Sequence, residues 1–192
     1  PTLADREKTL KQVIEDTGAV FIHPYNNMKV IEGQATAALE LLEETGKLDI
    51  IMTPVGGGGL LSGTALCTYY LSPSTMVTGT EPALADDAFR SFRDSVIYPP
   101  NPPLSVADGL LTSLGENTFR IIKQYVHNIV TVSEESIISS MKLIWERMKI
   151  IVEPSSSVPF AAITEKKMDI KGKKTGIILS GGNVDLNLLP WM

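Results

Sequence analysis

Four consecutive glycines, residues 56–59, are the part of this sequence best suited to binding chemistry. They follow an apolar run, residues 50–55, that is typical of a buried strand, and they precede residues 60–71, which are apolar enough for a core-facing helix. This order predicts a strand-to-helix turn where backbone amides converge at a helix N-terminus, whose unpaired N–H groups and dipole favour an anion. We therefore expect a phosphate or carboxylate cradle, with a tight turn of no function as the alternative.

The residues around the glycines argue against a nucleotide as the bound anion. A nucleoside-triphosphate loop needs Lys followed by Ser or Thr after its last glycine, whereas Leu60 and Leu61 follow here. The dinucleotide fingerprint needs glycine at its first, third and sixth positions, and counting from Gly56 or Gly57 places Leu61 or Ser62 at the sixth. The sequence therefore favours a smaller phosphate ester.

Three carboxylates, those of Glu81, Asp86 and Asp87, come directly after a predicted strand at residues 76–80. Oxygen ligands from such a loop suit a hard cation such as Mg²⁺ or Ca²⁺, with a backbone carbonyl and water completing the shell. Alternatively, Asp86 and Asp87 open a helix, where negative charge is favourable in the first turn. Taken alone, these residues favour the helix start.

Other polar residues have ordinary structural explanations when they are considered singly. Glu153 and the three serines that follow Pro154 are typical of a helix cap. Ser180, before two glycines, is either a hydroxyl presented at a strand end or a turn residue. His23 and His127 stand alone, outside any pattern of a catalytic triad or zinc site, and are expected to be structural.

Strands and helices alternate along the chain, which predicts an α/β fold with an open, mainly parallel sheet and helices on both faces. Strands are expected at residues 19–22, 50–55, 76–80, 128–132 and 175–179. Helices are expected at residues 5–17, 29–45, 60–71, 114–127, 134–148 and 158–166, with a loop at 91–105. Ligands of such sheets bind beyond the carboxyl ends of the strands, where the glycines, Glu81 and Ser180 all fall.

Composition excludes several classes of protein. The length of 192 residues suits one domain, or one domain with part of another. A net charge of -5 argues against nucleic-acid binding, and the apolar runs are too short to cross a membrane. The single Cys67 indicates a reducing compartment, so we expect a cytoplasmic protein. The start at Pro1 suggests a processed chain or a fragment.

Six motifs together resemble the serine racemase/threonine dehydratase family of pyridoxal-phosphate enzymes, and the likeness covers nearly the whole chain. The motifs are His23-Pro24-Tyr25-Asn26, Pro54-Val55-Gly56-Gly57-Gly58-Gly59-Leu60, Glu81-Pro82, Ala107-Asp108-Gly109, Glu153-Pro154 and Leu179-Ser180-Gly181-Gly182-Asn183. The resemblance implies a tryptophan synthase β-like fold. Residues 1–25 would end the small domain, and residues 26–192 would form an incomplete cofactor-binding large domain.

The resemblance also assigns binding roles to particular residues. The cofactor phosphate would be held by the backbone amides of Gly56, Gly57, Gly58, Gly59 and Leu60. Ser180 would contact the pyridine nitrogen, and Glu153 would order the polar groups around the ring. Glu81, the carbonyl of Ala85, and Asp87 would bind a structural and activating Mg²⁺ or Ca²⁺, which reverses the preference for a simple helix start.

A hydroxyl at the ring nitrogen has a chemical consequence. Unlike a carboxylate, it does not force that nitrogen to carry a proton, so the ring is a weaker electron sink. Weaker carbanion stabilisation favours proton transfer or β-elimination over transamination. A family member of this type would convert L-serine or L-threonine to a 2-oxo acid and ammonia, and could also racemise serine.

The resemblance implies that the residues that carry out the reaction lie outside this chain. In the family, the Schiff-base lysine, the second base and the loop that grips the substrate carboxylate lie in an N-terminal segment. The chain resembles roughly the C-terminal 60% of a member, so we expect no catalytic residue here and no activity from the chain alone. A missing N-terminal segment or a second copy in a homodimer would be its partner, and a small amino acid its substrate. A catalytically inactive phosphate-binding or interaction module is the alternative, and a cysteine synthase is a weaker one.

Overall fold

The computed structural model describes residues 3–102 and 104–192 and contains a four-stranded parallel sheet. The strands are β1 (Ile50–Pro54), β2 (Met76–Pro82), β3 (Asn128–Val132) and β4 (Thr175–Ile177), in the order β3-β2-β1-β4. Ile50 of β1 is opposite Met76 of β2 on one side and Thr175 of β4 on the other. The prediction of an α/β fold with an open parallel sheet is confirmed.

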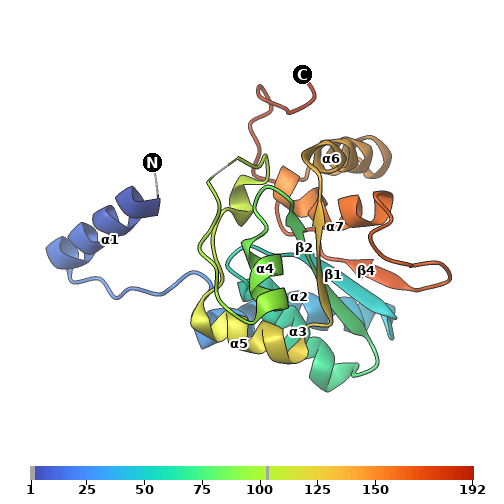
Figure 1. Cartoon of the computed structure of the whole chain (residues 1–192), viewed down its shortest axis with the longest axis horizontal. Helices are drawn as coiled ribbons and strands as arrows, with labels where there is room; N and C mark the ends of the chain where they lie inside the picture. The colour runs from blue at the N-terminus through green and yellow to red at the C-terminus, as the bar shows by residue number, and fades with distance from the viewer. Residues whose placement is uncertain (1–2, 103) are drawn as a thin grey trace.

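Helices cover both faces of this sheet (Figure 1). In the described part of the chain they are α1 (Leu3–Thr17), α2 (Met28–Thr45), α3 (Gly59–Leu71), α4 (Asp87–Asp94), α5 (Glu116–Tyr125), α6 (Glu134–Met148) and α7 (Pro154–Thr164), with a 3-10 turn η1 (Asp108–Leu110). Helices α2, α3 and α5 lie on one face, whereas α6 and α7 lie on the other. None of the helices described is long and apolar enough to cross a lipid bilayer.

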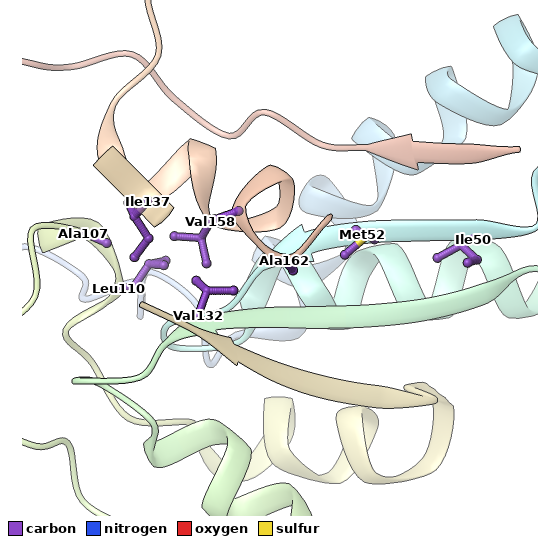
Figure 2. Packing of buried hydrophobic residues seen from close by; sticks show 9 residues of the cluster. Ile50, Met52, Ala107, Leu110, Val132, Ile137, Val158 and Ala162 are labelled. Carbon is purple, nitrogen blue, oxygen red and sulfur yellow. The ribbon is translucent and has the colours of Figure 1, made fainter. Parts of the chain in front are cut away.

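Every residue of β1 is buried, because helices pack on both of its faces. Figure 2 shows Ile50 and Met52 in one apolar cluster with Val158 and Ala162 of α7. Ile51, between them in sequence, instead joins a cluster with Leu42 and Leu48 on the opposite face, as the alternation of side chains along a strand requires. This double burial explains why the strand is a continuous apolar run.

Helix α3, which begins at the glycine run, packs very closely on α2. A Cβ atom at Gly63 would lie 2.5 Å from the carbonyl oxygen of Ile31 and 2.6 Å from the amide nitrogen of Ala35. Only a residue without a side chain allows the two backbones to approach this closely. The contact fixes α3, and therefore its N-terminus, against the rest of the domain.

The predicted strand at residues 19–22 is wrong. This segment has no regular secondary structure and no strand neighbour among the described residues, and Val20 and Ile22 are 87% and 64% exposed. A strand exists only where another strand pairs its backbone groups. Helix α1, on the far side of this segment, projects away from the other elements (Figure 1).

Several element boundaries also differ from those predicted; strand β2, for example, continues through Glu81 to Pro82. Helix α4 continues to Asp94, inside the stretch expected to be a loop from residue 91. Helix α7 begins at Pro154 instead of residue 158, because proline is well tolerated in the first turn of a helix. Strand β4 ends at Ile177 rather than residue 179, so Ser180 lies three residues beyond the last paired position.

Candidate cofactor and cation sites

The glycine run forms the predicted turn between β1 and α3. Gly58 is the N-cap of α3 and has φ +87°, a left-handed conformation that glycine adopts without strain. Thr118 of α5 donates a 2.8 Å hydrogen bond to the carbonyl oxygen of Gly57, which fixes the loop to a second helix. The first amides of α3 have no acceptor within the helix, so they are suited to an anion.

A cavity of about 370 Å³ opens in front of this turn. Its lining includes every residue predicted to contact the cofactor, namely Gly56, Gly57, Gly58, Gly59, Leu60, Glu153 and Ser180. These residues come from three separate parts of the chain and meet beyond the carboxyl ends of β1 and β4, where parallel sheets usually bind ligands. Glu153 is the one charged side chain among the described residues that line the cavity.

Tyr25 also lines the cavity, which sequence reasoning did not predict. The turn that carries it is held by His23, whose Nδ1 accepts hydrogen bonds from the amides of Tyr25 (3.4 Å) and Asn26 (3.0 Å). The His23 and Tyr25 rings meet edge to face, with centroids 4.5 Å apart. The expected structural role of His23 is thereby confirmed, and the short spacing from His23 to Tyr25 was the available signal.

Gly109, Leu110 and Thr112 also line the cavity. Sequence reasoning identified residues 107–109 as a turn and as one of the family motifs, without a role in the site. The amide of Gly109 donates a 3.1 Å hydrogen bond to Oγ of Ser155. Thr112 lies against the glycine loop, because its Oγ1 would be 3.3 Å from a Cβ atom at Gly56. Ser155 and Thr112 both line the cavity, so two hydroxyls join the predicted set.

Glu153 and Ser180 are held together by the turn after β4. The Glu153 amide donates to the carbonyl oxygen of Gly181 at 3.1 Å, and its carboxylate accepts from the amide of Asn183 at 3.2 Å. A Cβ atom at Gly181 would lie 2.8 Å from Glu153 Oε1, so the turn passes directly against this carboxylate. Glu153 also occupies the N-cap position of α7, but its side chain makes no capping hydrogen bond.

Two buried carboxylates, those of Glu81 in β2 and Asp87 in α4, flank the loop that joins these elements. Glu81 is fully buried, and its oxygens accept hydrogen bonds from the amides of Ala88 (3.0 Å) and Phe89 (2.9 Å) at the start of α4. Asp87, the first residue of α4, is also fully buried, and neither of its carboxylate oxygens has a hydrogen-bond partner among the described residues. Buried acceptors without partners are rare, and they fit a bound cation.

The ionisation of this pair reflects its burial. Burial, and next the charge of Asp87, raise the pKa of Glu81 well above its ordinary value of 4.5. Burial raises the pKa of Asp87 from 3.8 to about 7. Two neighbouring buried carboxylates are costly to ionise without a compensating positive charge. The neighbouring Asp86 pairs with Arg90, whose Nε donates to its carboxylate at 2.8 Å.

The donor set at this loop consists of two carboxylates and the backbone around Ala85, itself a buried residue. No group of three or more His, Cys, Asp and Glu side chains with metal-binding potential occurs in the part of the chain that the structure describes. A cation here would therefore need the Ala85 carbonyl or water in addition to Glu81 and Asp87. Asp87 does open a helix, so the two explanations offered by the sequence are compatible.

Comparison with known proteins agrees with this geometry. The family model described as "Pyridoxal-phosphate dependent enzyme" matches residues 1–181. The chain is 46% identical over 191 residues to a β-hydroxyaspartate dehydratase of Paracoccus denitrificans, and the match covers 100% of the chain and 61% of that protein.

Solved structures give the same result. Serine racemase from Dictyostelium discoideum superposes with a TM-score of 0.87 at 51% identity, over 96% of this chain and 60% of that one. The T.th. threonine deaminase gives a TM-score of 0.88 at 42% identity, over 93% and 66%. The chain thus spans about 60% of the length of the first relatives that it matches. It belongs to the family of pyridoxal-phosphate dependent enzymes, with their tryptophan synthase β-like fold.

Proposed function

We propose that this chain is the C-terminal part of an enzyme that eliminates water from L-serine or L-threonine and releases a 2-oxo acid and ammonia, and that also racemises serine. The observation that carries the proposal is the convergence of the glycine turn, Glu153 and Ser180 on one cavity in a member of this family. When bound, pyridoxal phosphate supplies an electron sink for the α-carbon of an amino acid.

The residues of this chain would bind and orient the cofactor. The amides of residues 56–60 hold its phosphate at the N-terminus of α3, where the dipole favours negative charge. Ser180 contacts the ring nitrogen, and Glu153 orders the polar groups beside it. The cradle is fixed on both sides, by Thr118 at Gly57 and by Ser155 at Gly109, so the cofactor would meet a preformed site.

We assign Mg²⁺ or Ca²⁺ to Glu81, the Ala85 carbonyl and Asp87. The carboxylate of Asp87 has no hydrogen-bond partner among the residues that the structure describes. This supports the assignment, because a divalent cation would remove the cost of burying two ionised groups. Glu81, Ala85 and Asp87 lie at the junction of β2 and α4, and none of them lines the cofactor cavity. The cation would therefore act on structure and activation instead of on the substrate.

The lysine that holds the cofactor and the groups that bind the substrate carboxylate would come from a segment outside this chain. The exposed residues of 19–22 and the projecting helix α1 support an assignment of residues 1–25 to the end of a second, smaller domain. Residues 26–192 would then form most of the large domain. We also propose that the whole protein is a homodimer; the cytoplasmic location stays a prediction from its single cysteine.

Substrates would be small amino acids with a hydroxyl on the β-carbon. The relatives are a β-hydroxyaspartate dehydratase, a serine racemase and a threonine deaminase, and a β-hydroxyl is common to the three amino acids that these names imply. Since the carboxylate-binding loop lies outside this chain, serine, threonine and 3-hydroxyaspartate should all be assayed.

The decisive experiment uses the whole protein purified with pyridoxal phosphate and Mg²⁺. Release of 2-oxo acid and ammonia from the three substrates, together with inversion of serine, would be followed by coupled assay and chiral chromatography. The 192-residue chain, assayed in parallel, should bind the cofactor but release no product. If the whole protein binds cofactor without turning over any of the three, the alternative of an inactive phosphate-binding module is correct.

A further inference from the structure

Asn101 lies in the loop between α4 and η1, and it fastens this loop to the segment that joins β2 to α4. Its Nδ2 donates a 3.3 Å hydrogen bond to the carbonyl oxygen of Leu84 and a 2.8 Å hydrogen bond to Oδ1 of Asp86. Its Oδ1 accepts a 2.8 Å hydrogen bond from the guanidinium of Arg90, which also donates to Asp86 through Nε. One amide side chain therefore holds groups on both sides of Ala85 in the sequence.

The orientation of this amide is fixed by its partners. A carbonyl oxygen and a carboxylate accept hydrogen bonds, so the NH₂ group of Asn101, with its two protons, faces Leu84 and Asp86. A guanidinium can only donate, so the amide oxygen faces Arg90. A flipped amide would direct its oxygen toward two acceptors. The direction of each bond thus follows from the chemistry of the partner.

The peptide group that joins Leu84 to Ala85 is held at both of its polar atoms. Its N–H donates a 3.0 Å hydrogen bond to the carbonyl oxygen of Pro82, and its carbonyl oxygen is the acceptor for Asn101. On the other side of Ala85, the Asp86 carboxylate is held by Asn101 as well. The Ala85 carbonyl therefore belongs to a short segment that Asn101 fixes before and after it.

The loop of Asn101 is also fastened to the first turns of α4. Ser91 is fully buried, and its Oγ donates a 2.5 Å hydrogen bond to the carbonyl oxygen of Asp87 and accepts a 2.9 Å hydrogen bond from the Tyr98 amide. The guanidinium carbon of Arg90 lies 4.8 Å from the centroid of the Tyr98 ring. The loop is thus attached beside two of the three groups that we assign to the cation.

We propose that Asn101 is a positioning residue of the cation site, which holds the Ala85 carbonyl where it can join the two carboxylates. The inference rests on the proposed cation site. Groups that hold a metal ligand in place without touching the metal change metal affinity by about 10–100-fold when they are removed. The size of the change should depend on the cation, because Mg²⁺ demands near-octahedral geometry whereas Ca²⁺ accepts irregular shells. A displaced carbonyl should therefore weaken Mg²⁺ binding more.

The test uses the whole protein, purified with pyridoxal phosphate and then freed of divalent cations with a chelator. Calorimetric titrations with CaCl₂ and with MgCl₂ at pH 8 give the two dissociation constants. Asn101→Ala should raise the Kd for Ca²⁺ about tenfold and the Kd for Mg²⁺ by a larger factor. Ser105→Ala is the matched control, because Ser105 lies in the same loop and its hydroxyl instead donates to Glu134 Oε2 of α6 at 3.1 Å. Both constants should stay at the parent values in this control.

The possible outcomes separate the role of Asn101 from the cation site itself. Unchanged constants in Asn101→Ala would overturn the role of Asn101 alone. An increase that is equal for the two cations, or larger for Ca²⁺, would also overturn it, because general loosening of the loop would then explain the loss. The same holds if Ser105→Ala weakens binding as much as Asn101→Ala. If the parent protein binds neither cation, the proposed cation site is wrong, and the inference with it.

Discussion

The ring of Tyr25 lies directly against the backbone of Gly57, so that a Cβ atom at residue 57 would be 2.4 Å from the ring carbons. The two residues belong to different segments, the turn before α2 and the turn before α3. Glycine at position 57 therefore has a steric reason beyond backbone freedom, since a larger residue would displace the tyrosine from the cavity wall.

Gly57→Ala should lower the affinity of the chain for pyridoxine 5′-phosphate at least about tenfold, equivalent to roughly 1.4 kcal/mol, because Tyr25 must move. Fluorescence titration measures the affinity. Gly33→Ala is the control: residue 33 lies in α2 with nothing within 4 Å of its added Cβ. That variant should keep its affinity and gain about 0.5–1 kcal/mol of stability. Equal affinities in both variants would contradict the steric argument.

The cation assignment predicts a pH-dependent stabilisation. Burial raises the pKa of Asp87 from 3.8 to about 7. The contribution of this group to stability is therefore fully present below pH 3.8 and is lost as the pH rises through 7. Without metal, the chain should therefore become less stable from about pH 4 to pH 8. Added Ca²⁺ or Mg²⁺ should raise the melting temperature more at pH 8 than at pH 6, since the carboxylates must ionise to bind it.

Asp87→Asn should abolish this response to cations. Asp94→Asn is the matched control on the same helix, because Asp94 is a surface carboxylate paired with Arg93 at 2.7 Å. Differential scanning fluorimetry at both pH values gives the comparison. A cation response that survives in Asp87→Asn would exclude this loop as the binding site.

Glu165 should make the chain sensitive to acid. Burial raises its pKa, but hydrogen bonds from Ser136 and Ser133 outweigh this and lower it from 4.5 to about 2. Its stabilising effect is present above pH 4.5 and is lost as the pH falls toward 2. Glu165→Gln should flatten the decrease in unfolding free energy below pH 4.5, measured with urea. Glu32→Gln changes an exposed position of α2. The unfolding free energy of this variant should decrease below pH 4.5 as it does in the parent chain.

Asn26 should be required to hold the Tyr25 turn against α5. Its Oδ1 accepts from the Asn117 amide at 2.9 Å, and its backbone carbonyl accepts from Asn117 Nδ2 at 3.1 Å. Asn26→Ala removes the acceptor of the half-buried Asn117 amide at the start of α5 and should cost about 1–3 kcal/mol in urea unfolding. It should also speed exchange of the Asn117 amide. Asn187→Ala, in an exposed turn, should leave both measurements unchanged.

Local patterns were sufficient to predict most of the fold. The apolar run of β1 is buried on both faces, and Ser133, an expected N-cap, accepts from the Ser136 amide at 3.3 Å. The exception, residues 19–22, has a strand-like composition but no partner strand in the described chain. Strand formation depends on pairing, which no local pattern encodes.

In the candidate site, too, some residues could be predicted from the sequence and others could not. The glycines at 56–59 could be predicted from their place between a strand and a helix, whereas Glu153 and Ser180 were assigned to the site only through the family resemblance. Tyr25 and Thr112 could not be predicted, because they contact the glycine loop only after segments distant in sequence have packed together. The spacing from His23 to Tyr25 indicates a turn but not where that turn packs, and tertiary contacts bring both side chains to the cavity.

Strand β4 has a consequence for how the protein is made. Thr175 pairs with Ile50, so the two strands are separated by most of the chain, and closing so long a loop is slow. On the ribosome, β1, β2 and β3 can associate while the residues after them are still being added, but β1 keeps one edge open until β4 emerges. Ser180 follows β4, and the cofactor cavity is therefore completed only after a period in which an exposed strand edge is vulnerable to misassociation.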